Sequence, residues 1–406
     1  MSDSTSLPAA ALYQACAAES LPFETTAELD DGGELFGQER AVDAIRFGID
    51  MKIAGHNLFV IGPPGTGRRR FVSEFLEHQA LRDAAPDDWC YVNNFDDPAR
   101  PRTLMLPAGV GKRLAADVER CLEEVQAALG AAFASEDYRT RRQAIEREFE
   151  EQQGHALEQV QEAARARGIR IMQTPGGMVF APVVDGAVLG PEEFEKLPPE
   201  QQKTIELAVE ELGKMLQETM RHTPERLRAA RDRIRELDRQ VAEFAIERLL
   251  NDLLRQYHAV PAARDYLTAM RSDLVNHYQV LRAQPEQGAS PFPMMAEADE
   301  PGDTRAQRRY AVNVLVSNDP HHGAPVVIEE RPSYGRLIGK IEHRARFGAL
   351  LTDFRLIRAG ALHQANGGYL VMNALRLLSE PFAWDALKET LRTGSIRIVP
   401  LEQVYG

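Results

Sequence analysis

The sequence predicts an α/β protein in which a parallel sheet covered by helices is interrupted by a large helical insertion. Helix and strand patterns alternate in residues 35–106, and strand-like runs return after residue 308. Between them, residues 111–281 place apolar side chains at intervals of three and four among many charged ones, which is typical of long amphipathic helices. We therefore expect one α/β domain, split in two by the helical segment.

Shifts in composition along the chain predict the domain boundaries. Residues 1–32 form an N-terminal extension, 33–108 the first part of the α/β domain and 109–282 the helical insertion. Residues 283–307 are rich in Pro, Gly, Glu and Asp, as flexible linkers are. Residues 308–406 then supply an incomplete second part of the α/β domain.

The first part of the α/β domain begins with a helix over residues 38–52, where apolar residues recur at helical spacing. A short apolar run at 57–61 ends in glycine and predicts a strand. A second helix over 69–81 and a second strand at 89–92 follow.

The insertion is expected to form antiparallel, partly coiled-coil helices that carry a small β-hairpin at their tip. Strand-like runs at 169–172 and 178–184 flank a Pro-Gly-Gly turn at 175–177. Pro224 and Pro261 predict the starts of later helices, since proline is favoured in the first helical turn.

The second part of the α/β domain has three further strand-like runs before its last helix. These runs lie at 310–316, 326–329 and 368–372. The helix is expected over 381–392, and a final strand-like run covers 396–399.

Composition narrows the classes of function. The chain has 406 residues, of which 44% are hydrophobic and 27% charged, and a formal net charge of -13. That charge disfavours broad binding to nucleic acid or to an anionic membrane, and the arginine-rich runs at 139–142 and 221–235 have acidic residues among or beside them. Three cysteines without Cys-x-x-Cys or Cys/His spacing predict no metal site. We expect a cytoplasmic protein, not attached to a membrane, whose partners are nucleotides or proteins.

A glycine-rich loop between the predicted strand at 57–61 and the following helix has the form of a phosphate-binding loop. It consists of Gly62, Pro63, Pro64, Gly65, Thr66, Gly67, Arg68 and Arg69. In such loops backbone N–H groups converge on phosphate oxygens, a Lys reaches the β- and γ-phosphates and a Ser or Thr hydroxyl binds Mg²⁺. Arg68 and Arg69 occupy the last two positions, and Arg69 has no oxygen for a metal. The alternative is a turn that only packs.

A second motif, at residues 365–374, also lacks the residues that bind Mg²⁺ and activate water in a nucleotide site. An apolar strand that ends in Asp-Glu would place an aspartate near the magnesium ion and a glutamate near the attacking water. Here Asn373 and Ala374 take those two places, so neither side chain is charged. Two independent losses favour a relic of a nucleotide-binding fold over chance variation in one loop.

These motifs resemble the AAA+ module of the Lon protease family. Residues 35–41 (Leu-Phe-Gly-Gln-Glu-Arg-Ala) and 59–67 look like the start of that module, and 335–374 are similar to the corresponding part of LonB-like and LonC-like proteases. The resemblance extends over about 33–406. It implies a hexamer in which an AAA+ ring feeds unfolded or damaged proteins to a C-terminal peptidase with a Ser-Lys dyad.

From this resemblance we expect the substrate-handling and assembly region of a Lon-like serine protease of the ATP-dependent type. The peptidase domain would lie beyond residue 406, so no catalytic residue is assigned in this chain. ATP or ADP is expected to bind weakly, with no firm Mg²⁺ site, since Asn373 replaces the acidic ligand. Two alternatives stay open: a non-catalytic protein-binding scaffold or gate, and an active AAA+ ATPase with a variant loop.

Two groups of residues are candidates for contact with protein substrates. The resemblance places Phe347 and Gly348 where a pore loop would project, whereas the alternative for Phe347 is a core aromatic. Met172, Met178 and Phe180 give the hairpin tip an apolar character that marks interaction surfaces. The alternative is that the hairpin packs on itself.

Overall fold

The computed structural model describes residues 8, 11, 13, 15–29, 38–51, 53, 55–63, 65–174, 177–184, 187–190, 194–195, 197–282, 305–346 and 349–399. The chain divides into two compact units. Unit 1 comprises Met1–Pro86, Pro320–Lys340 and Ala359–Gly406, and unit 2 comprises Asp87–Asp319 and Ile341–Arg358.

Unit 2 is built on a three-stranded antiparallel sheet with the strand order β2-β1-β6. The strands are β1 (Asp88–Val92), β2 (Arg102–Leu106) and β6 (Val312–Val316), so the strand predicted at 89–92 is confirmed, and the run at 310–316 is a strand from Val312 onwards. The prediction of a parallel arrangement is wrong for this sheet. A short loop joins β1 to β2, which suits antiparallel neighbours and leaves no room for the crossover helix that parallel strands need.

The core of unit 2 forms where helices pack on this sheet. Helix α3 (Val110–Ala134) buries Leu114, Val118 and Leu129 in one cluster with Val92 of β1 and Leu106 of β2. Helix α7 (Pro261–Asn276) adds further residues to that cluster, and Pro261 begins it as predicted.

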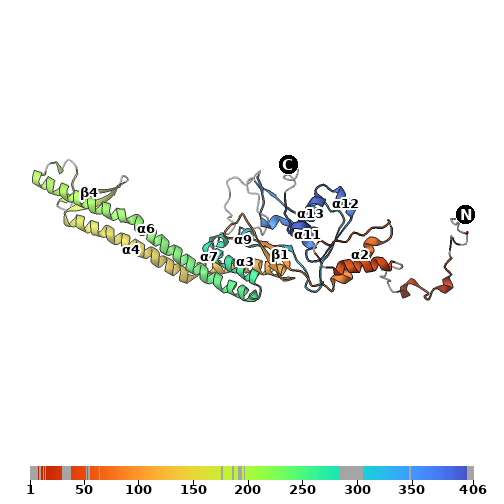
Figure 1. Ribbon diagram of the computed structural model, residues 1–406. Helices are drawn as coiled ribbons and strands as arrows, with labels where there is room; N and C mark the ends of the chain where they lie inside the picture. Colours follow the sequence, from red (N-terminus) through yellow and green to blue (C-terminus); the bar gives the residue numbers. More distant parts are fainter. Residues whose placement is uncertain are drawn as a thin grey trace. The chain divides into compact units, whose positions relative to one another are not determined.

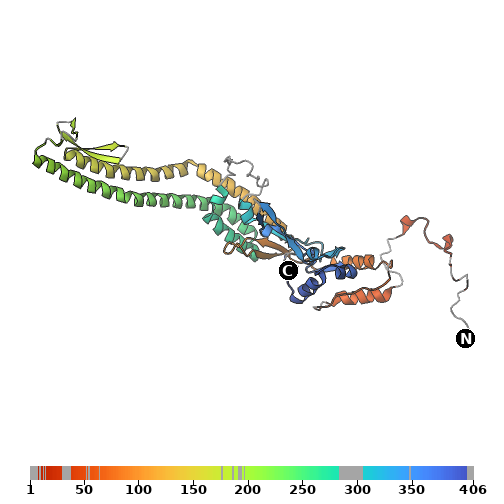
Figure 2. The same ribbon diagram turned by 90° about the horizontal axis from the view of Figure 1, so that it is seen from above.

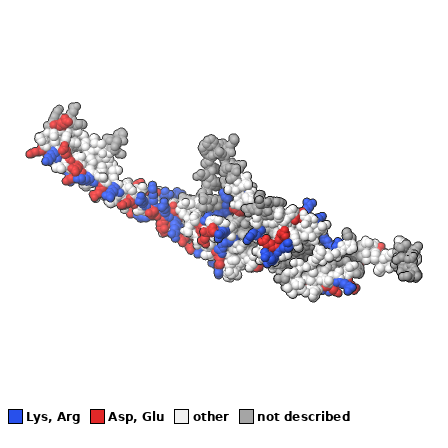
Figure 3. Space-filling model, turned by 45° about the horizontal axis from the view of Figure 1, so that its top comes forward, with Lys and Arg blue, Asp and Glu red and all other residues white. Residues whose placement is uncertain are grey.

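A long arm of two antiparallel helices extends from this core. Helices α4 (Glu136–Ala166) and α6 (Pro199–Gln256) lie side by side in Figures 1 and 2. Tyr138 donates its hydroxyl to Asp238 at 2.7 Å, and Arg233 pairs with Glu148 at 2.9 Å. Figure 3 shows acidic and basic residues interspersed along the arm, as expected for a solvated helix surface.

Pro224 does not begin a helix, contrary to the prediction, because it lies inside α6. Helix-forming sequence continues on both sides of it, so packing against α4 holds one continuous helix through a residue that lacks a backbone N–H.

The predicted hairpin is confirmed at the end of the arm. Strands β3 (Ile169–Thr174), β4 (Gly177–Val184) and β5 (Ala187–Val188) form an antiparallel sheet. Ile171 lies opposite Phe180 in the register, and both pack against a buried cluster of Ala164, Ile169 and Leu212.

Unit 1 has a layered arrangement around one parallel strand pair. Strands β7 (Val326–Glu329) and β12 (Tyr369–Met372) pair in parallel, as predicted for this part of the chain. Val326, Tyr369 and Val371 pack against a cluster of buried residues from α1 (Glu39–Asp50) and α2 (Arg68–Ala80). Their neighbours in sequence pack against a second cluster from helices α10–α13. These four helices are α10 (Tyr334–Ile338), α11 (Ala361–Gln364), α12 (Ala374–Ser379) and α13 (Ala383–Thr393).

Shorter elements complete the description. They are η2 (Ala18–Ser20), η3 (Thr26–Glu28), α8 (Gln279–Arg282), α9 (Arg305–Tyr310), β8 (Gly339–Ile341), β9 (Arg344–Arg346), β10 (Ala349–Leu351), η5 (Phe354–Leu356) and β11 (Ile357–Ala359). Among the described helices, none combines the length and the apolar composition needed to span a lipid bilayer.

Two predicted strands are wrong, at 57–61 and at 396–399, where the structure has no regular secondary structure. Phe59 and Ile61 are exposed, whereas Ile396 and Ile398 pack against the helices of unit 1. An apolar run becomes a strand only when a neighbouring strand takes up its backbone hydrogen bonds, and neither run has such a neighbour in the part of the chain described.

Candidate functional site

The glycine-rich loop leads directly into α2, as the sequence predicts. Gly67 precedes the helix with a φ of 69°, in the left-handed region that favours glycine. The hydroxyl of Thr66 donates to the carbonyl of Pro63 at 2.9 Å, which closes the loop on itself. Pro64 lies outside the described residues.

Of the two arginines of the loop, Arg69 forms an ion pair with another part of unit 1, whereas Arg68 lies beside the loop itself. The side chain of Arg68 lies over Gly62, where an added Cβ would come within 3.0 Å of its Cδ. Arg69 Nη2 lies 2.6 Å from Oε1 of Glu330, the residue that follows β7. Hydrogen bonding with Arg69 and the attraction of its positive charge lower the pKa of Glu330, so this carboxylate is ionised at neutral pH.

Asn373 lies where the sequence places it, directly after β12, but its side chain has a structural role. Asn373 Oδ1 accepts a hydrogen bond from the backbone N–H of Arg376 at 3.0 Å and so caps the start of α12. Arg376 Nη1 in turn donates to the carbonyl of Glu330 at 2.8 Å.

The parallel register brings these groups to one edge of the strand pair. Met372 is the partner of Glu329, so Glu330 and Asn373 both follow the carboxyl ends of adjacent strands. In open α/β sheets, ligands bind at this edge. The structure thus assembles Arg69, Glu330, Asn373 and Arg376 into one polar cluster of unit 1.

These residues do not fit a magnesium-bound nucleotide of the kind that active P-loop proteins hydrolyse. Arg69 has no hydroxyl for the metal and already pairs with Glu330. The carboxamide oxygen of Asn373 is committed to a helix cap, and Ala374 has no carboxylate to orient water. Among the described residues, no three His, Cys, Asp or Glu side chains gather as a metal site would require.

Sequence reasoning missed Glu330 and Arg376. Glu330 directly follows a predicted strand, and strand ends are where such sites form, so a signal for it was present. The hydrogen bond from Arg376 to Asn373 also had a signal in the sequence. An Asn at the N-cap of a helix accepts a hydrogen bond from the backbone N–H two or three residues later, and Arg376 is three residues after Asn373.

The candidate residues for substrate contact do not form one surface. Phe180 packs inward against α6, whereas Met172 and Met178 are each 37% exposed. Met172 pairs across the hairpin with Val179, which is 46% exposed, so the outer face of the tip is apolar. Phe347 and Gly348 lie outside the described residues.

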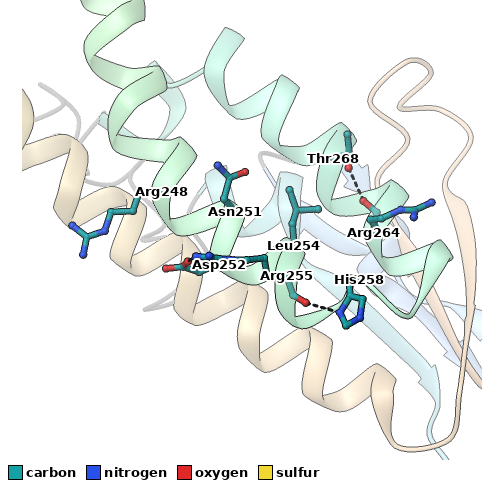
Figure 4. Close-up of a pocket in the computed structure, with 8 residues that line it drawn as sticks. All are labelled: Arg248, Asn251, Asp252, Leu254, Arg255, His258, Arg264 and Thr268. Atoms are coloured by element: carbon teal, nitrogen blue, oxygen red, sulfur yellow. Dashed lines mark hydrogen bonds and ion pairs between the residues drawn. The ribbon is translucent and has the colours of Figure 1, made fainter.

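A groove of about 800 Å³ lies between α6 and α7 in unit 2 (Figure 4). Arg248, Arg255 and Arg264 line it, but Arg255 pairs with Asp252 and Arg264 with Asp265. Since two of its three arginines are already paired with carboxylates, the groove offers little net positive charge to a ligand.

Two segments of the chain match protein-family models. Residues 322–406 match the LonB-like AAA domain, and residues 88–121 match the Lon-like LonC helical domain. The first match covers β7, β12 and the residues Glu330, Asn373 and Arg376, and an AAA domain makes nucleotide binding possible. No curated protein sequence matches the chain. Both matches are to domains of Lon-like proteases, and together they support a Lon-like protease family member.

Proposed function

We propose that this chain is the substrate-handling and assembly region of a Lon-like protease and that it has little or no ATP turnover. The observation that carries the proposal is the internal pairing of Arg69 with Glu330, together with the use of Asn373 as a helix cap. In an active P-loop ATPase the corresponding positions hold a metal and position water.

An ATP turnover assay on the full chain with Mg²⁺ tests this proposal. We expect turnover far below about one per second, an ordinary enzymatic rate. Turnover near that rate which is lost on Arg68→Ala would contradict the proposal and support an active ATPase with a variant loop.

Peptide-bond hydrolysis, in this proposal, is the task of a Ser-Lys peptidase domain, as in the family that the chain resembles. Unfolded or damaged proteins are the substrates, and the working form is a homo-oligomer, with a hexamer expected. Sedimentation of the whole protease and degradation of an unfolded protein without nucleotide test these points.

A second candidate function is a gate or scaffold that binds proteins without degrading them. The exposed apolar pair Met172 and Val179 at the arm tip favours this function, because such pairs mark contact surfaces. Degradation of an unfolded substrate by the whole protease separates the two functions.

A further inference from the structure

We infer that the Arg69–Glu330 ion pair takes over the bridging role that metal-bound nucleotide has in an active P-loop protein. It joins the start of α2 to the carboxyl ends of β7 and β12, so this edge of unit 1 is held together without a ligand. The inference rests on the proposed function, since it assigns the residues that make nucleotide unnecessary.

The geometry supports a bridge between three elements. Arg69 belongs to the first turn of α2, Glu330 follows β7, and Arg376 lies in α12 directly after β12. Glu330 is held twice, because Arg69 binds its carboxylate at 2.6 Å and Arg376 binds its main-chain carbonyl at 2.8 Å. Asn373 then fixes the backbone of Arg376.

The guanidinium of Arg69 can replace a metal ion as the cationic partner of Glu330. A guanidinium is a permanent cation with several N–H donors, so it can satisfy a carboxylate at a strand end where a divalent metal would otherwise lie. The side chains of Arg69 and Glu330 are 60% and 61% exposed, and an isolated pair at that exposure contributes little. Arg376 binds the main-chain carbonyl of Glu330, and its positive charge also favours the ionised carboxylate, so three charges act together at this edge. Networks of several charges are where surface ion pairs gain strength.

A double-mutant cycle read by hydrogen exchange tests the inference in the full chain. The amides of residues 71–74, which make the first hydrogen bonds of α2, are followed in the parent, Arg69→Gln, Glu330→Gln and the double variant. We expect each single change to speed exchange at least about threefold, and the double variant to exchange no faster than either single one. Arg69→Lys keeps the positive charge and should lose less protection than Arg69→Gln.

Arg358→Gln is the control, because Arg358 makes a short arginine–glutamate ion pair with Glu342, at 2.8 Å, in unit 2. It should leave exchange at residues 71–74 unchanged. ADP with Mg²⁺ should likewise leave exchange in the parent unchanged.

The inference would be overturned if the double variant exchanged faster than either single variant, by the product of the two single effects. It would also be overturned if ADP and Mg²⁺ slowed exchange of the same amides in the parent. The ATP turnover assay is independent of this cycle. Failure of the ion-pair inference is therefore distinguishable from failure of the proposed function.

Discussion

At the scale of single residues, the buried carboxylate of Asp273 in α7 accepts several hydrogen bonds. Arg309 Nε and Nη2 each lie 2.6 Å from its oxygens, and the Tyr310 hydroxyl donates to it at 2.7 Å. Burial acts to raise the pKa of Asp273, but hydrogen bonds from Arg309 and Tyr310 outweigh it and bring the pKa below its usual value. This pairing ties α9 to α7.

Asp273→Asn should destabilise unit 2 by about 3 kcal/mol, since it leaves Arg309 without its carboxylate in a largely buried place. Urea unfolding followed by circular dichroism measures the effect. Asp265→Asn is the control, because Asp265 is exposed and its pair with Arg264 is long at 3.4 Å; it should change stability by less than about 0.5 kcal/mol. Equal losses of stability in the two variants would contradict the stabilising role of the Asp273–Arg309 pair.

A pH-sensitive residue lies in unit 1. Burial lowers the pKa of His363 from 6.5 to about 4, and its Nδ1 lies 3.3 Å from the backbone N–H of Gly360, which suits the neutral ring as an acceptor. The unfolded chain therefore binds a proton that the folded chain does not, between about pH 4 and 6.5. Stability from this residue is complete above pH 6.5 and is lost as the pH falls through that window.

We expect the free energy of unfolding of unit 1 to fall by about 2 kcal/mol from pH 7 to pH 4.5 because of His363. His363→Gln keeps an acceptor but cannot titrate, so its stability should depend less on pH. Thermal unfolding at a series of pH values compares the two. If the stability of both proteins fell equally with pH, His363 would not be the source of the pH dependence.

At the scale of elements, α6 contains a proline where a helix tolerates it poorly. Pro224 cannot donate a hydrogen bond to the preceding turn, and its ring crowds that turn. The helix nevertheless runs from Pro199 to Gln256 without a break.

Pro224→Ala should therefore stabilise the arm by about 2 kcal/mol. The measurement is the unfolding midpoint of the helical signal in urea. Thr223→Ala, at the neighbouring position, is expected to change stability by less than about 0.5 kcal/mol. A loss of stability in Pro224→Ala would contradict this expectation.

At the scale of the whole molecule, the arm tip is the candidate point of contact with other proteins. Replacing Met172 and Met178 by Ser should leave the helices folded, because both side chains are partly exposed. In the whole protease, we expect a severalfold change in degradation of an unfolded substrate or in oligomer formation. Phe180→Ala is a contrasting variant that should loosen the tip itself, since Phe180 packs against the buried cluster of Ala164, Ile169 and Leu212. Unchanged degradation and assembly in the double Ser variant would leave the tip without a binding role.

Local sequence patterns predicted many of the helices and the hairpin, whereas contacts between residues far apart in the sequence could not be predicted. Helical periodicity predicted α3 and much of α6, and the Pro-Gly-Gly turn predicted the hairpin, because both depend on nearby residues. The run at 57–61 shows the limit, since a strand requires a partner that its own residues do not specify. The same limit applies to the candidate site. Its glycine-rich loop and Asn373 were predicted from local patterns. The pairing of Arg69 with Glu330 was not, because these residues are 261 positions apart and only folding brings them together.

The pairing of β1 with β6 has a consequence for synthesis of the chain. β1 can pair with β2 as soon as both leave the ribosome, but its other edge must wait for β6, because Val92 pairs with Val312. More than two hundred residues separate them, which takes on the order of ten seconds or more to translate at about 5–20 residues per second. During that time the edge of β1 is an open template for other strands. The helices of the arm are made in this interval, so they fold while the sheet beneath them still lacks its last strand.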